Sequence, residues 1–116
     1  KEIGTPAWMP PEMLMDEESA KRQSIASQYT RKSDVYSYGM ILWELLTRRV
    51  PFEEIRNTVV LSQKIVQGHR PEMPEHCPEK WSRLIQRCWA HHPEQRPYIN
   101  DVIKTFEAPL MQFDHC

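Results

Sequence analysis

Apolar residues recur at helical spacing in four segments of the chain, and no segment shows the strict apolar–polar alternation of a surface strand. The most apolar segment runs from Asp34 to Arg48, and little of its circumference is polar; its apolar residues include Val35, Tyr38, Ile41, Leu42, Leu45 and Leu46. This pattern predicts a helix that is buried on several sides. Ser33 is its expected N-cap. Gly39 costs such a helix about 1 kcal/mol relative to Ala, so we expect another element to approach its backbone closely.

Three more helices are predicted downstream. The first covers Thr58 to Gln67, is capped by Asn57 and ends at Gly68. The next opens at Pro78 and carries the amphipathic stripe Trp81, Leu84, Ile85, Cys88 and Trp89. The last ends near Pro109 and carries Ile99, Val102, Ile103 and Phe106 at the same spacing. The prolines of residues 1–13 and the polar composition of residues 15–33 predict loops. The expected fold class is therefore mainly α.

Composition and charge exclude only a few classes of protein. The 116 residues suit one small domain, and 15 basic against 16 acidic side chains give no reason to expect nucleic acid or an anionic membrane as a partner. The apolar run Met40 to Trp43 is far shorter than a membrane span. Three cysteines are too few for a disulfide framework, which favours a reducing compartment and a cytoplasmic location. Because the first residue is Lys1 and not Met, we expect the chain to start inside a longer protein.

Three sequence motifs indicate more than an unspecified helical domain. They are GTPAWMPPE at residues 4–12, SDVYSYG at 33–39 followed by LWEL at 42–45 and VPF at 50–52, and CWAHHPEQRP at 88–97. In this order and spacing, the chain resembles a protein-kinase catalytic domain from the end of its activation segment to its last helix. The resemblance implies an incomplete helical C-terminal lobe over residues 1–108, with a tail at 109–116.

In that family the first motif is a substrate-docking loop followed by the motif written A-P-E, which reads Pro10-Pro11-Glu12 here. The third motif resembles the turn that returns an arginine to that glutamate. The resemblance thus implies a buried structural ion pair between Glu12 and Arg96, since a planar guanidinium can bind both carboxylate oxygens. The alternative from the residues alone is two exposed charges on separate loops.

The resemblance also assigns roles to other polar residues. Asp34 would anchor the backbone of the catalytic loop in the intact domain; otherwise it only interacts with the helix dipole. The docking loop would comprise Gly4, Thr5, Pro6 and Trp8, with the Thr5 hydroxyl beneath the phospho-acceptor rather than simply solvated. Gly4-Thr5 favours serine/threonine specificity, whereas Trp8 to Glu12 is similar to tyrosine kinases. That combination resembles the tyrosine-kinase-like group of serine/threonine kinases.

Other residues have structural interpretations. Trp43 and Trp89 lie in apolar helical stripes and are expected in the core. Glu44 either faces a substrate groove or forms an internal pair. Cys88 and the neighbouring histidines lack the paired spacing of a zinc site, so no metal site is predicted. The polar stretch around residues 16–27 is longer than is usual in the family, and we interpret it as a surface insertion with a regulatory or partner role.

The residues that perform phosphoryl transfer are not in this sequence. It contains no G-x-G-x-x-G, no His-Arg-Asp and no Asp-Phe-Gly. The chain alone is therefore predicted to hold no catalytic and no ATP-binding residue, and to be molten or prone to aggregation without the helices that would cover its central helix. The parent kinase would use ATP and Mg²⁺ on a protein substrate, and the chain would pack against the missing N-lobe and catalytic loop. The alternatives are a pseudokinase scaffold that binds protein partners, or a helical interaction module unrelated to kinases.

Overall fold

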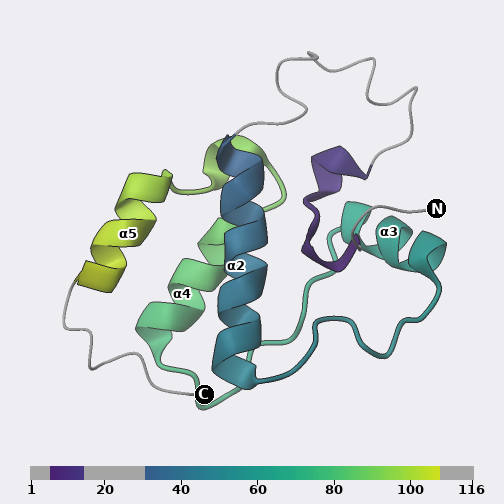
Figure 1. The fold of residues 1–116 in the computed structure, drawn as a ribbon, viewed down its shortest axis with the longest axis horizontal. Helices are drawn as coiled ribbons and strands as arrows, with labels where there is room; N and C mark the ends of the chain where they lie inside the picture. Colours follow the sequence, from purple (N-terminus) through teal and green to yellow (C-terminus); the bar gives the residue numbers. More distant parts are fainter. Residues whose placement is uncertain (1–5, 15–30, 108–116) are drawn as a thin grey trace.

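The computed structural model describes residues 6–14 and 31–107 (Figure 1). These residues form no strand and are mainly helical, which confirms the predicted fold class. The α-helices are α2 (Arg31–Thr47), α3 (Thr58–Val66), α4 (Glu79–Cys88) and α5 (Ile99–Glu107). Short 3-10 helices are η1 (Pro6–Trp8), η2 (Pro11–Met13) and η4 (Pro93–Gln95).

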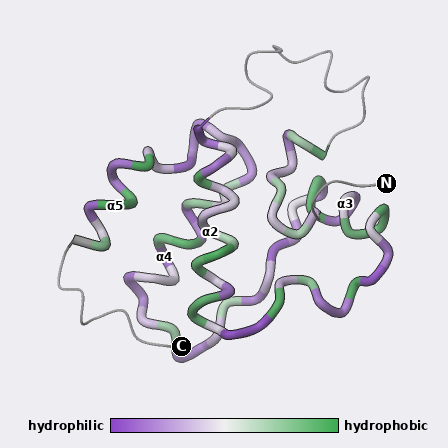
Figure 2. The backbone as a smooth tube through the Cα atoms, in the orientation of Figure 1, coloured by the Kyte–Doolittle hydropathy of each residue, from purple (hydrophilic) through white to green (hydrophobic). Residues whose placement is uncertain are grey.

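Helix α2 is the central element of the described part. Helices α4 and α5 pack on one side of it, and η1 packs on the other, with α3 against η1 and η2 (Figure 1). Its buried apolar side chains form the middle of the core, and they are Val35, Tyr36, Met40, Leu42, Trp43 and Leu46. Hydrophobic positions, green in Figure 2, occur in both α2 and α4 where the two helices run side by side. Helix α2 therefore contacts both the segment that carries the first motif and the segment that carries the third motif.

The ends of α2 differ from the prediction. The helix begins at Arg31, so Ser33 lies inside it and is not the N-cap. It ends at Thr47 because Arg48 adopts a left-handed backbone, with φ of 59°. Two of its apolar side chains, Ile41 and Leu45, are 44% and 51% exposed. The expectation of burial on several sides therefore holds for most of the circumference of α2, and one apolar stripe is left open to solvent.

Gly39 explains why α4 can lie so close to α2. A Cβ atom added to Gly39 would be 2.6 Å from the Cβ of Cys88 in α4. Such a distance is far inside van der Waals contact, so only glycine fits at this crossing. The close approach predicted for the backbone of this residue is present, and Cys88 is a free, fully buried thiol.

The remaining helices follow the predicted pattern with one error. Asn57 caps α3 by accepting hydrogen bonds from the amides of Val59 and Val60 at 2.9 and 3.0 Å. In α5, Val102 is fully buried, but Ile103 is 45% exposed. The predicted stripe of α5 is therefore wrong at that residue, because this short helix contacts the rest of the fold along a narrow face.

Candidate functional site

The carboxylate of Glu12 and the guanidinium of Arg96 face each other at the centre of the candidate site. Nη1 of Arg96 donates to Oε2 of Glu12 and Nη2 donates to Oε1, both at 2.9 Å. Glu12 is 8% exposed and Arg96 is 2% exposed. The two residues predicted from the motifs to pair are 84 positions apart in sequence and form a bidentate, buried ion pair.

Arg96 also binds three main-chain carbonyls. Its Nε donates to the carbonyl of Ala90 at 2.7 Å, Nη1 donates to that of Lys32 at 3.0 Å, and Nη2 donates to that of His91 at 3.1 Å. Together with the bonds to Glu12, these use every N–H of the guanidinium. One side chain therefore joins η2, the first turn of α2 and the turn after α4.

The protonation of the pair is set by opposing effects. Burial alone would raise the pKa of Glu12, but the hydrogen bonds and positive charge of Arg96 together outweigh it, and the pKa is lowered. Tyr36 lies beneath the pair, with its ring centroid 5.0 Å from the Cζ of Arg96 and 5.1 Å from that of Arg70. Burial raises the pKa of Tyr36 to about 12. The phenol therefore stays neutral, and its ring offers a π-face to both cations.

Helix α2 also holds the described part of the first motif. The indole Nε1 of Trp8 donates to Oε1 of Glu44 at 3.1 Å, and Oγ of Ser37 donates to the carbonyl of Trp8 at 2.6 Å. Pro6 is buried beside them. Glu44 thus forms an internal pair, one of its two predicted roles. Gly4 and Thr5 lie outside the described residues.

Asp34 lies in the first turn of α2 with an exposed side chain. A carboxylate there is stabilised by the positive end of the helix dipole. The catalytic loop that it is predicted to anchor is not part of this sequence, so that role stays a prediction. Trp43 and Trp89, expected in the core, are 3% and 6% exposed.

Comparison with known proteins decides which family has this arrangement. The family described as "Protein tyrosine and serine/threonine kinase" matches residues 1–106. The chain belongs to the protein-kinase family. It is 38% identical to the "Probable serine/threonine-protein kinase drkD" of Dictyostelium discoideum over 95% of this chain and 8% of that protein. It is 34% identical to the "Serine/threonine/tyrosine-protein kinase HT1" of Arabidopsis thaliana over 98% of this chain and 26% of that protein. The chain therefore spans a small part of each of these relatives.

Two residues of this kinase lobe were missed by sequence reasoning. Ser33, interpreted as a helix cap, donates from its hydroxyl to Oε2 of Glu12 at 2.9 Å. Lys32 donates from Nζ to the carbonyl of Arg96 at 2.8 Å, and its Nζ lies 4.2 Å from the ring centroid of Tyr98. Ser33 is the first residue of the second motif and Lys32 directly precedes it, so their place in or next to a recognised motif was the one available signal.

The described residues of this kinase lobe contain no group of three or more His, Cys, Asp or Glu side chains that could hold a metal ion. In the same residues, no helix is long and apolar enough to cross a membrane.

Proposed function

We propose that this chain forms the C-terminal part of the large lobe of a kinase whose parent protein transfers the γ-phosphate of ATP to serine and threonine side chains of protein substrates. The observation that carries the proposal is the buried, bidentate pair of Glu12 and Arg96. This pair joins the A-P-E-like motif to the turn that carries the third motif. Support for Ser/Thr specificity comes from the Gly4-Thr5 dipeptide and from the similarity to drkD of Dictyostelium discoideum, which is named as a probable serine/threonine-protein kinase.

Within such a kinase this chain would supply framework and substrate docking, not ATP chemistry. Helix α2 would hold the docking segment through Glu44 and Ser37 and the A-P-E-like motif through Ser33. ATP and Mg²⁺ would bind to other parts of the parent protein, which would contain the glycine-rich loop, the His-Arg-Asp loop and the Asp-Phe-Gly motif. The isolated chain would transfer no phosphate, and we expect the parent protein to be cytoplasmic.

The proposed function also accounts for the exposed apolar stripe of α2, formed by Ile41 and Leu45. Ile41 and Leu45 would pack against another part of the kinase domain, because exposed apolar side chains on a central helix gain free energy when they are covered. A matched pair of variants tests this in the full-length protein. Leu45→Asp should lower the melting temperature markedly, whereas Val59→Asp, at the similarly exposed Val59 on α3, should change it little. Equal changes in melting temperature for the two variants would show that no other part of the kinase covers Ile41 and Leu45.

The experiment that tests the function is a transfer assay with the full-length protein, ATP, Mg²⁺ and a mixed protein substrate. The sites that gain phosphate are identified by mass spectrometry. We expect phosphoserine and phosphothreonine, and no transfer by residues 1–116 alone. Phosphotyrosine alone would refute the specificity. Loss of both ATP binding and transfer in the full-length protein would refute the activity and favour the pseudokinase scaffold.

A further inference from the structure

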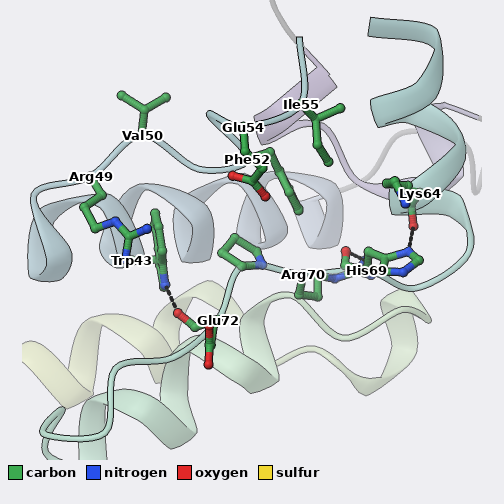
Figure 3. A pocket seen from close by; sticks show the side chains of 11 residues that line it. Trp43, Arg49, Val50, Phe52, Glu54, Ile55, Lys64, His69, Arg70 and Glu72 are labelled. Carbon is green, nitrogen blue, oxygen red and sulfur yellow. Dashed lines mark hydrogen bonds between the residues drawn. The ribbon is translucent and has the colours of Figure 1, made fainter. Parts of the chain in front are cut away.

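A pocket of about 500 Å³ lies between the α2–α3 connection and the segment that follows α3 (Figure 3). Its aromatic floor consists of Trp43 and Phe52, which are 3% and 7% exposed. The indole Nε1 of Trp43 donates to the carbonyl of Glu72 at 3.0 Å, so the one polar atom of the floor is already satisfied. The volume falls in the range of pockets that hold a ligand or an inserted side chain.

This pocket is distinct from the docking segment described above. Trp8 and its partner Glu44 do not line it, although Glu44 directly follows Trp43 in α2. The two residues follow each other on a helix, so their side chains point about 100° apart, and one helix serves both places. Whatever enters the pocket therefore need not compete with the Trp8–Glu44 contact.

The charges around the pocket have a positive excess. Arg49, Lys64 and Arg70 line it, against the carboxylates of Glu54 and Glu72. Figure 3 shows Arg49 and Lys64 at opposite ends, with the aromatic floor between them.

Arg70 adds a positive charge, and its hydrogen-bond partners are all neutral. Its hydrogen bonds go to main-chain carbonyls, those of Trp89 at 2.9 Å, Ile65 at 3.2 Å and His69 at 2.7 Å. Burial lowers the pKa of Arg70, but a guanidinium remains charged at neutral pH. A low-dielectric floor beside this charge and two cationic ends favours an anionic occupant.

We propose that this pocket binds an acidic segment of a partner protein, which inserts a bulky apolar side chain between Trp43 and Phe52. Carboxylates on either side of that side chain pair with Arg49 and Lys64. Val50, which is 50% exposed at the rim, is covered when the segment binds. The proposal goes beyond the kinase activity, since binding here requires no phosphoryl transfer.

Fluorescence anisotropy with the full-length protein tests the proposal in the absence of ATP. The probe is a short fluorescein-labelled peptide with a central Leu-Phe pair flanked by aspartates. One control peptide has lysines in place of the aspartates, and another has serines in place of the Leu-Phe pair. We expect the acidic, apolar peptide to bind about tenfold more tightly than either control, a difference of about 1.4 kcal/mol. Its affinity should fall as salt is added.

Charge reversal locates the binding site. Arg49→Glu and Lys64→Glu should each weaken binding about tenfold, as removal of a charge pair across an interface does. Lys104→Glu is the matched control, because Lys104, like Lys64, is a basic residue in the last turn of its helix but lies on α5. Val50→Asp is a second variant, expected to weaken binding by repulsion at the rim.

Three outcomes would overturn the proposal: no measurable binding of the acidic peptide, equal binding of the lysine peptide, or unchanged affinity in the Arg49, Lys64 and Val50 variants. None of these bears on the transfer assay, so this proposal and the proposed function fail independently.

Discussion

The hydroxyl of Ser33 donates a 2.9 Å hydrogen bond to Oε2 of Glu12, although the two residues lie 21 positions apart. Ser33 is 1% exposed and belongs to the first turn of α2. The same carboxylate oxygen accepts Nη1 of Arg96. The ion pair is therefore attached directly to the central helix, and the helix, the A-P-E-like motif and the last turn form one connected polar network.

Ser33→Ala should destabilise the protein by about 1.5–3 kcal/mol, because it removes a buried hydrogen bond to a charged group. Urea unfolding of the full-length kinase, followed by tryptophan fluorescence, measures the loss. Ser62→Ala in α3 is the matched control, since Ser62 is only partly buried and should cost much less. A Ser33 variant as stable as the control would remove this hydroxyl from the network.

Arg96→Ala should cost more, about 3–5 kcal/mol, because it leaves the carboxylate of Glu12 buried without its partner. Arg96→Lys should recover only part of the loss, since an ammonium cannot bind both oxygens and the three carbonyls in the same plane. Thermal and urea unfolding of the full-length protein measure both variants. Arg83→Ala is the control, because the Arg83–Glu79 pair in α4 is exposed and such pairs contribute about 1 kcal/mol or less. A loss for Arg96→Ala no larger than for this control would contradict the structural role.

Trp8→Phe should weaken substrate docking more than it weakens the fold. The ring is kept, but the hydrogen bond from Nε1 to Glu44 is lost. Under the proposed function, we expect a several-fold higher KM for the protein substrate and an unchanged KM for ATP, because the docking segment loses an anchor while the ATP site is elsewhere. Steady-state kinetics of the full-length kinase with each substrate varied in turn measures this. Trp81→Phe, in the α4 core, is the control for a general packing defect. An equal rise in both KM values for Trp8→Phe would argue against a docking role.

Much of the fold could be predicted from local pattern. The spacing of apolar residues identified the four helices, and Asn57 and Pro78 marked helix starts that the structure also has. The errors occur where a tertiary contact overrides a local preference. Ser33 has the chemistry of an N-cap, but a buried carboxylate takes its hydroxyl, and the helix extends past it to Arg31.

The candidate site was predictable only through the motifs. Nothing in the spacing of Glu12 and Arg96 requires them to meet, and composition would allow both to be exposed. The three carbonyls that Arg96 binds are invisible in a sequence, because any residue can supply a main-chain acceptor. The pocket above Trp43 and Phe52 was missed for a related reason: its floor comes from α2 and the connection after it, and its walls are completed by α3 and residues 69–72.

Gly39→Ala should destabilise the protein by about 1–3 kcal/mol, although alanine is the better helix former. The added methyl group would be 2.6 Å from the Cβ of Cys88, so α4 would have to move away from α2. Cys88→Ala should not rescue the variant, because alanine keeps the clashing Cβ. Gly39→Ala combined with Cys88→Gly should be less damaged than the two single losses added together. Urea unfolding of the wild type, of Gly39→Ala, of Cys88→Gly and of the double variant gives this coupling free energy. Strict additivity would show that the two positions do not clash.

Protonation of Glu12 should account for part of the stability that the protein loses at low pH. Its pKa in the folded state is lowered from 4.5, so below about pH 4.5 the unfolded chain binds a proton more readily than the folded one. Stability from this group is therefore present above the unfolded pKa and is lost as the pH falls through the folded pKa. Urea unfolding of the full-length protein between pH 7 and pH 3 should show a decline that is shallower in Glu12→Gln, which cannot take up that proton. If Glu12→Gln keeps the full acid dependence, folding does not lower the pKa of Glu12, and the acid sensitivity belongs to other groups.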